Sequence, residues 1–406
     1  MHIGINASFL SKPGTGIGQV THNVLRTLIY NTQYLIPNTY ELFLYCEETP
    51  NLPFALPENF HTRVFLPRWW KRDDLIRKML WERRLAEEAM KDNCDVFLSL
   101  YQSATKLESR IMNHESGKIR HVMVVHDIIP RLFPEYRGNI QQAFHWKMVE
   151  RGIKKADHIV AISEHTKKDL VRELLLSEKN ISVVSPDVAP QFRQSISPET
   201  VTAVLKKYSL SPGYIYHGGG LEVRKNTERL LRAYATLVSS PSTSLSSSQS
   251  LRVEDRTEIP MLVISGKIFD TSNKLATDVE GLIEKLHLQG KVRLLGFAPE
   301  EDLPALYRGA LFFVYPSLYE GFGLPVLEAL CQNVPVLTSN SSSLPEVGGK
   351  AAIYVDPTDT EALTIQMKRL LTDEPLRAAL ISESASQAAK FNWKYFVRKI
   401  IATLKQ

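Results

Sequence analysis

Short apolar runs alternate with longer helical segments along this chain, and the alternation occurs in two successive series. The first series of expected strands is Met1–Ala7, Tyr40–Tyr45, His61–Leu66, Asp95–Leu100, Val122–Val125 and Ile159–Ile162. The pattern weakens around Pro186–Leu210. It restarts with Tyr214–His217, Met261–Ser265, Val292–Leu295, Leu311–Tyr315, Val334–Thr338 and Ala352–Val355. Because strands that alternate with helices favour a parallel sheet covered on both faces, the sequence predicts an α/β protein with two doubly wound domains.

The composition is that of a folded protein. The 406 residues correspond to two or three domains of roughly 150 residues each. With 44% hydrophobic and 23% charged residues, the chain is too apolar to be mainly disordered. The N-terminus lacks the basic and apolar segments of a signal peptide, and no stretch approaches the ~20 apolar residues of a membrane-spanning helix.

The three cysteines, Cys46, Cys94 and Cys331, are far apart and have no CxxC spacing. Such a set supports neither a disulfide framework nor a structural zinc site. A reducing, cytoplasmic compartment is therefore expected. The formal net charge of +5 is small, so only a local concentration of basic residues would attract phosphates or anionic lipid.

The most informative stretch lies in the second half. The expected strand Leu311–Tyr315 is followed by the glycine-containing turn Glu320–Pro325 and then by a helix over Val326–Leu330. The start of such a helix has free backbone N–H groups that favour a phosphate. Glu320 and Glu328, eight residues apart, suit the hydroxyls of a sugar and a ribose. The alternative is that Glu320 caps the helix and Glu328 is a solvated helical charge.

A second glycine-rich loop follows the first strand of the second half. It contains Gly218, Gly219 and Gly220, and Arg224 and Lys225 come shortly after, at the start of a helix. Glycines let the backbone approach a ligand closely, and the two cations supply charge-assisted donors for a diphosphate. The alternative is a helix start with two solvated basic residues.

Two weaker motifs lie in the first half. Gly14, Gly16 and Gly18 follow the first strand with the spacing of a dinucleotide loop, but the acidic residue that such a site needs is not evident, so a plain tight turn is the alternative. His126 and Asp127 lie at the end of a strand, where ligands of such sheets bind. His126 could bind a substrate hydroxyl or carry a proton. The alternative to such a role is a histidine that is simply packed at the strand end. No HExxH, P-loop or GxSxG motif is present.

Together these motifs resemble family 4 of the retaining GT-B glycosyltransferases, the glycosyltransferase group 1 family, over nearly the whole chain. Glu320 and Glu328, within EGFGLPVLE, match the family's two glutamates separated by seven residues. Arg224 and Lys225 match its phosphate-binding Arg-Lys pair. Three further matches lie in the first half of the chain: Gly14–Gly18, His126 and Ile162–Leu170. The stretch Val184–Pro190 departs from the family's usual loop at the end of the N-terminal domain.

This resemblance implies two Rossmann-like domains that face a cleft. It implies an acceptor-binding domain at residues 1–190, a nucleotide-sugar-binding domain at residues 205–388, and a C-terminal helix at residues 389–406 that crosses back to the N-terminal domain.

The resemblance also implies roles for individual residues. Arg224 and Lys225 would hold the diphosphate, Glu320 would contact the sugar, and Glu328 would bind the ribose. The implied catalytic residues are His126, Arg224, Lys225 and Glu320. The implied donor-binding residues are Gly16, Gly219, Gly220, Arg224, Lys225, Gly296, Phe297, Glu320, Phe322, Gly323, Leu324 and Glu328.

The implied activity is transfer of a sugar from a nucleotide-sugar to a glycan or lipid-linked acceptor with retention of configuration, in polysaccharide biosynthesis. GDP-mannose is the first candidate donor. No metal or other cofactor is expected, because Arg224 and Lys225 can neutralise the diphosphate leaving group. No nucleic-acid partner is expected, since the basic residues match no such motif. The alternatives are another GT-B enzyme, such as a nucleotide-sugar epimerase, and a non-catalytic nucleotide-sugar binder.

Two segments have unusual compositions. Residues 68–84 combine aromatic and basic side chains, beginning with Arg68, Trp69 and Trp70. They suit peripheral contact with the inner face of an anionic membrane, and the alternative is an amphipathic helix with salt-bridged charges. The serine-rich stretch Ser239–Ser250 predicts a flexible surface insertion without a catalytic role.

Overall fold

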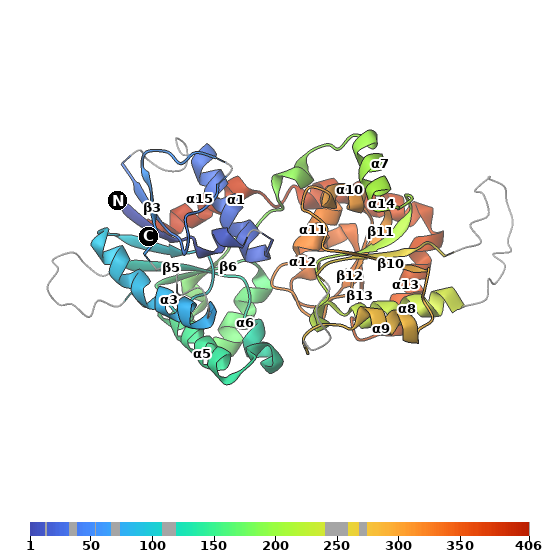
Figure 1. Cartoon of the computed structure of the whole chain (residues 1–406), viewed down its shortest axis with the longest axis horizontal. Coiled ribbons are helices and arrows are strands. Elements are labelled where there is room, and N and C mark those ends of the chain that lie inside the picture. Colours follow the sequence, from blue (N-terminus) through green and yellow to red (C-terminus); the bar gives the residue numbers. More distant parts are fainter. Residues whose placement is uncertain are drawn as a thin grey trace. The chain divides into compact units, whose positions relative to one another are not determined.

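The computed structural model describes residues 1–12, 14–31, 39–52, 54–65, 74–107, 119–239, 259–267 and 274–405. The chain forms two compact units (Figure 1). Unit 1 comprises Met1–Asp187 and Phe391–Gln406, and unit 2 comprises Val188–Lys390.

Unit 1 is built on a parallel sheet with the strand order β3-β2-β1-β4-β5-β6-β7. These strands are Phe60–Arg63, Glu41–Tyr45, His2–Asn6, Val96–Ser99, Arg120–Val125, His158–Ala161 and Ile181–Val183. The helices are α1 (Gly16–Tyr30), α3 (Asp74–Lys91), α4 (Ile129–Leu132), α5 (Ile140–Lys155), α6 (Glu164–Leu174) and α15 (Trp393–Leu404). The central strands are buried along almost their whole length, as expected when helices cover both faces of a parallel sheet.

The last helix, α15, packs within unit 1 against α1 and β5 (Figure 1). Its buried stripe includes Phe396, Val397 and Ile400, which are at most 1% exposed and recur at helical spacing. The Arg120 side chain on β5 also donates a hydrogen bond to the Thr403 carbonyl oxygen. The predicted return of the C-terminal helix to the N-terminal domain is therefore confirmed.

Unit 2 has a parallel sheet with the order β10-β9-β8-β11-β12-β13. These strands are Val292–Gly296, Leu262–Ser265, Tyr214–His217, Ala310–Tyr315, Val336–Ser339 and Ala352–Val355. The helices are α7 (Pro198–Lys207), α8 (Thr227–Ser239), α9 (Val279–Lys285), α10 (Leu303–Arg308), α11 (Leu324–Cys331), α12 (Leu344–Gly348), α13 (Thr360–Thr372) and α14 (Glu374–Ala388). One core joins the sheet to α8, α9, α13 and α14, through residues such as Leu230, Ile264 and Met367.

Three details differ from the expected elements. The strand β7 (Ile181–Val183) was not among the expected strands, because it is only three residues long and two of them are half-buried. The helix α11 begins at Leu324 rather than Val326, since Pro325 is accepted in the first turn of a helix. The helix α8 extends to Ser239, and the rest of the serine-rich stretch lies outside the described residues.

The described part of the basic segment belongs to α3. There Trp81 and Leu85 are fully buried, Arg77 forms an ion pair with Glu47 (2.8 Å), and Arg84 lies 3.7 Å from Glu88. This part is an amphipathic helix in which Arg77 and Arg84 are paired with glutamates. Arg68–Arg72 lie outside the described residues. No helix in the part of the chain that the structure describes is long and apolar enough to cross a membrane.

Candidate active site

The strand order of unit 2 reverses between β8 and β11. These two strands are neighbours, and the strands that follow them in sequence lie on opposite sides, β9 beyond β8 and β12 beyond β11. Ligands of open parallel sheets bind at such a switch point, beyond the carboxyl ends of the strands. The loops that leave β8 and β11 carry Arg224, Lys225 and Glu320, and these three side chains meet there.

Glu320 is the centre of a buried charged cluster. Its Oε1 accepts hydrogen bonds from Lys225 Nζ (2.7 Å) and the Tyr315 hydroxyl (2.8 Å), and its Oε2 accepts one from Arg224 Nη1 (2.9 Å). The Lys225 ammonium also donates to the Tyr315 hydroxyl. Arg224 Nε donates to Glu222 Oε2 at 2.7 Å. Lys225, Tyr315 and Glu320 are 6%, 0% and 7% exposed, so water screens these interactions weakly.

The neighbouring charges decide how these groups ionise. Burial alone would raise the pKa of Glu320, but Arg224 and Lys225 outweigh burial and lower that pKa to about 2. Burial lowers the pKa of Lys225, and Glu320 opposes this change. Burial and the charge of Glu320 raise the pKa of Tyr315 well above its ordinary value. At neutral pH, Glu320 is therefore a carboxylate and Tyr315 keeps its hydroxyl hydrogen.

Asn226 joins the two loops that carry the cluster. Its backbone is left-handed (φ 62°), and its Nδ2 donates to the carbonyl oxygens of Pro316 (3.0 Å) and Pro357 (2.7 Å). The Leu318 N–H also donates to the Arg224 carbonyl oxygen at 2.8 Å. The cations of one loop are thus held against the carboxylate of the other by backbone contacts as well as by charge.

Two glycines in these loops have no room for a side chain. Gly219 has a φ of 94°, and a Cβ there would lie 2.9 Å from Pro325 Cγ. Gly323 has a φ of 111°, and a Cβ there would lie 2.7 Å from Leu344 Cδ2. Only glycine adopts this conformation readily. Gly220 is also left-handed, but a Cβ there would have no atom within 4 Å, so its backbone borders open space.

The amino end of α11 lies next to this loop. Gly323 is the N-cap residue, and its carbonyl oxygen accepts from the N–H groups of Val326 and Leu327. The Leu324 N–H has no acceptor within hydrogen-bonding distance among the described residues. The Phe322 side chain is buried, and its carbonyl oxygen accepts from Ser343 Oγ at 2.7 Å.

Glu328 lies inside α11 and is 7% exposed. Its Oε2 accepts a hydrogen bond from the Tyr307 hydroxyl on α10 at 2.8 Å. Burial raises the pKa of Glu328 to about 7, although the Tyr307 hydroxyl opposes this change. Glu328 is therefore not a solvated helical charge, and its ionisation changes close to neutral pH.

The structure places Gly296 and Phe297 apart from the charged cluster. Gly296 ends β10, the outermost strand on that side of the sheet, with a φ of 67°. Phe297 follows in the loop and is 69% exposed. Both residues lie at the carboxyl ends of the strands, but β9 separates β10 from β8.

The remaining two predicted site residues belong to unit 1. Gly16 is the first residue of α1, and a Cβ there would have open space around it. His126 follows β5 and is 6% exposed, with its Nε2 2.9 Å from the Leu100 carbonyl oxygen. Burial lowers the pKa of His126 to about 4, so the ring is neutral at neutral pH. A carbonyl oxygen only accepts, so Nε2 carries the hydrogen and Nδ1 is left as an acceptor.

Three residues that contact the predicted site residues are not themselves predicted from the sequence as site residues: Tyr315 and Glu222 in the charged cluster, and Tyr307 beside Glu328. Tyr315 ends the predicted strand immediately before the glutamate loop, so its position is a usable signal. Glu222 precedes Arg224 by two residues, and side chains with this spacing do not face each other on an α-helix. A 3₁₀ turn at Val223–Lys225 brings the two side chains together instead. Tyr307 gave no local signal, because it meets Glu328 only through packing between α10 and α11.

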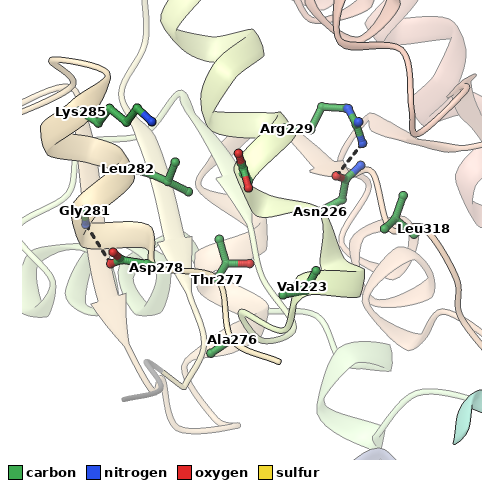
Figure 2. Close-up of a pocket in the computed structure, with 11 residues that line it drawn as sticks. Val223, Asn226, Arg229, Ala276, Thr277, Asp278, Gly281, Leu282, Lys285 and Leu318 are labelled. Atoms are coloured by element: carbon green, nitrogen blue, oxygen red, sulfur yellow. Dashed lines mark hydrogen bonds between the residues drawn. The ribbon is translucent and has the colours of Figure 1, made fainter. Parts of the chain in front are cut away.

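A pocket of about 520 Å³ lies in unit 2 beside α8 and α9, and Val223, Asn226 and Leu318 of the two cluster loops form part of its lining (Figure 2). None of the predicted donor-binding residues lines it. Two of its polar side chains already have partners: Arg229 donates to Asn226 Oδ1 (3.1 Å), and Asp278 accepts from the Gly281 N–H (3.0 Å). Among the described residues, no group of three or more His, Cys, Asp or Glu side chains could hold a metal ion.

Two known families match the chain, one in each half. The family described as "Glycosyltransferase Family 4" matches residues 24–191, and the family described as "Glycosyl transferases group 1" matches residues 209–387. The second match contains Arg224, Lys225, Glu320 and Glu328.

Several known proteins resemble this chain. The O-antigen chain mannosyltransferase B of Escherichia coli is 34% identical over 291 residues, which cover 70% of each chain. The serotype-specific mannosyltransferase WbdA of Escherichia coli is 31% identical over 67% of this chain, and the match covers about a third (32%) of WbdA.

The fold also matches a solved structure. The structure of Anabaena HepE with UDP-glucose matches with a TM-score of 0.70 and 15% identity, covering 100% of this chain and 99% of that one. This likeness concerns the fold alone. The expected fold class, two Rossmann-like parallel sheets with a C-terminal helix on the first, is confirmed.

Proposed function

The chain belongs to family 4 of the retaining GT-B glycosyltransferases, the glycosyltransferase group 1 family, and we propose that it transfers mannose from GDP-mannose to a growing polysaccharide. The glycosyltransferase class follows from the family. Mannose is supported by two similar proteins of Escherichia coli, which are both named as mannosyltransferases. The acceptor that we propose is a glycan chain, free or lipid-linked, as the O-antigen activity of the first relative suggests.

The buried cluster of Arg224, Lys225 and Glu320 carries this proposal. Departure of the nucleoside diphosphate places negative charge on its phosphates, and preorganised cations stabilise such charge most strongly where water is excluded. Arg224 and Lys225 would hold the diphosphate, together with the free N–H of Leu324. Glu320 would contact the sugar while it fixes the two cations.

The other donor contacts are proposed from the family pattern and are compatible with the geometry. Gly219, Gly220 and Gly323 would allow the phosphates to approach the backbone, with Phe322 nearby in the same loop. Glu328 would accept hydrogen bonds from the ribose. Gly296 and Phe297 would hold the base through main-chain contacts.

Unit 1 would supply the acceptor side. Gly16 would approach the diphosphate or the acceptor. His126 would contact the primary hydroxyl of the sugar. Its neutral ring accepts a hydrogen bond at Nδ1 and is a poor proton donor, so we assign it a binding role at the reacting face.

We propose a front-face mechanism for retention. In it, the bond between the anomeric carbon and the donor phosphate breaks, and the acceptor oxygen bonds to that carbon on the same face. The acceptor hydroxyl proton goes to the donor phosphate, which departs as the nucleoside diphosphate. Glu320 is unsuited to be a nucleophile, because three hydrogen bonds and two cations hold its carboxylate at a pKa of about 2. We expect this reaction to need no metal, since Arg224 and Lys225 would stabilise the negative charge of the leaving group.

A thermal-shift panel tests the donor assignment. Nucleoside diphosphates and nucleotide-sugars of guanine, uracil and adenine are each added at the same concentration, so the size of the shift ranks their affinities. A ligand present at 100 times its dissociation constant stabilises the folded state by about 2.7 kcal/mol, which is easily measured. We expect GDP and GDP-mannose to raise the melting temperature most. A shift with UDP-glucose alone would overturn the mannose assignment but not the glycosyltransferase class.

We place the reaction in the cytoplasm. The three cysteines are free thiols, and free thiols are typical of proteins in a reducing compartment. We further propose that the basic segment at residues 68–84 contacts an anionic membrane, chiefly through residues 68–72, since Arg77 and Arg84 of α3 are paired with glutamates within the fold. Flotation with anionic liposomes tests this contact: the wild-type chain should float at low salt, and R68Q/K71Q/R72Q should not. No flotation of the wild-type chain would exclude the contact.

A further inference from the structure

Arg224 has a second carboxylate partner besides Glu320. Its Nε lies 2.7 Å from Glu222 Oε2, while its Nη1 lies 2.9 Å from Glu320 Oε2. We propose that Glu222 is an internal counter-ion of the Arg224 guanidinium and that the donor diphosphate displaces the Glu222 carboxylate when it binds. This competition would set the affinity for the diphosphate. This inference rests on the proposed function of the same cluster.

The charges of the cluster sum to zero. Arg224 and Lys225 carry two positive charges, and Glu222 and Glu320 carry two negative charges. A nucleoside diphosphate is itself a polyanion, so it gains little attraction from a neutral cluster. Tight binding therefore requires that one carboxylate leave its cation.

The two carboxylates differ in how firmly they are held. The Glu320 side chain is 9% exposed and is fixed by Lys225, Tyr315 and Arg224. The Glu222 side chain is 34% exposed, and within the described part of the chain Arg224 is the partner of its carboxylate. Glu222 is consequently the carboxylate that can move aside into water at low cost.

The backbone at residue 222 is anchored independently of the side chain. The Glu222 carbonyl oxygen accepts from the Lys225 N–H at 2.8 Å, and residue 222 pairs with Ala276 in a β-bridge. Rotation of the Glu222 side chain therefore leaves the loop in place. Arg224 also stays anchored through the Tyr319 carbonyl oxygen (3.3 Å) and Glu320.

Neutralising Glu222 should strengthen diphosphate binding. Partly exposed ion pairs are worth up to about 1 kcal/mol, and each 1.4 kcal/mol is a factor of ten in affinity. We therefore expect E222Q to bind inorganic pyrophosphate, GDP and UDP about twofold to fivefold more tightly than the wild-type chain. Guanosine and uridine lack phosphate, so their binding should not change.

Isothermal titration of the full chain with these five probes tests the proposal. E228Q is the matched control, because Glu228 is also a half-exposed carboxylate with an arginine partner, Arg232, at 2.7 Å. It removes the same charge from the same unit but not from the cluster, so it should bind pyrophosphate like the wild-type chain. The unfolding temperature of each variant confirms that it is folded.

The variant R224Q separates the two proposals. Loss of pyrophosphate binding in R224Q, with a gain in E222Q, supports both. Loss in R224Q with no gain in E222Q, or with an equal gain in E228Q, overturns the role of Glu222 alone. Wild-type affinity in R224Q, or no pyrophosphate binding by either the wild-type chain or E222Q, overturns the assignment of the diphosphate site and the role of Glu222 with it.

Discussion

At the scale of single residues, Lys225 links the stability of unit 2 to its proposed chemistry. Its ammonium is buried and neutralises Glu320, whose carboxylate would otherwise be expensive to bury. The same ammonium is the cation that we propose for the diphosphate. Substitutions at this position should therefore change two properties, and a second substitution should separate them.

We expect K225M to lower turnover by about 100-fold or more, because loss of one preorganised charge-stabilising group typically costs 10²–10³ in rate. The free energy of unfolding should also fall, by about 2 kcal/mol, since Arg224 still neutralises Glu320 in part. The double variant K225M/E320Q should regain most of that stability without regaining turnover. Denaturant titration and steady-state kinetics measure the two effects. Near-normal turnover of K225M would contradict the assignment.

Glu328 predicts a pH dependence near neutrality. Burial raises its pKa in the folded state to about 7, above the ordinary value of 4.5 that we expect in the unfolded chain. Between these values the folded state holds a proton that the unfolded state has lost, so stability falls as the pH rises from about 4.5 to about 7. The total change is about 3 kcal/mol.

The measurement compares the wild-type chain with E328Q. The free energy of unfolding of E328Q should depend less on pH over this range. If the ionised carboxylate binds the ribose, the wild-type affinity for GDP should rise more steeply between pH 6 and pH 8 than that of E328Q, whose remaining change comes from the terminal phosphate of GDP. An equal pH dependence of stability in both proteins would contradict the raised pKa.

The site residues that are predictable from the sequence are those marked by their neighbours in the chain. Arg224 and Lys225 follow a glycine-rich loop, and Glu320 follows a strand. The partners Tyr307 and Glu222 could not be predicted in this way, because one contact depends on packing between two helices and the other on a 3₁₀ turn. The ionisation of Glu328 likewise depends on its burial, which its position in a helix does not reveal.

At the scale of elements, the helix α15 lies at the C-terminal end of the sequence but belongs to unit 1, whose larger part is Met1–Asp187. It contributes Phe396, Val397 and Ile400 to the core of unit 1, although some 200 residues of unit 2 precede it in the chain. Its helical spacing was readable from the sequence. The long buried strands were also predictable, because strands covered on both faces are continuous apolar runs. The short β7 does not have such a run.

Removal of one aromatic ring from α15 should loosen unit 1 selectively. Phe396 is 0% exposed, and replacement of a buried phenylalanine by alanine typically costs 3–5 kcal/mol. In F396A, hydrogen exchange should accelerate in α1 and β5 and stay unchanged in β8 and β11. The control Y395A removes a ring from the neighbouring, 52% exposed position and should have little effect. Unchanged exchange in unit 1 of F396A would contradict this role of α15.

At the scale of the whole molecule, the two units have similar parallel sheets but carry different candidate site residues. Unit 2 holds the two cations, the buried glutamates and the glycine loops at the switch point of its sheet. Unit 1 holds a neutral, buried histidine and a glycine-rich helix start. In the proposed function, unit 2 would hold the donor diphosphate and unit 1 would act on the acceptor.

The most direct test of this account is the anomeric configuration of the first product, measured by NMR. The reaction combines the wild-type chain, the donor selected by the nucleotide panel and a mannose oligosaccharide acceptor, with K225M as the inactive control. We predict that an α-linked donor gives an α-linked product and that K225M gives almost none. A β-linked product would contradict retention, and an equally fast reaction in K225M would contradict the role of the charged cluster.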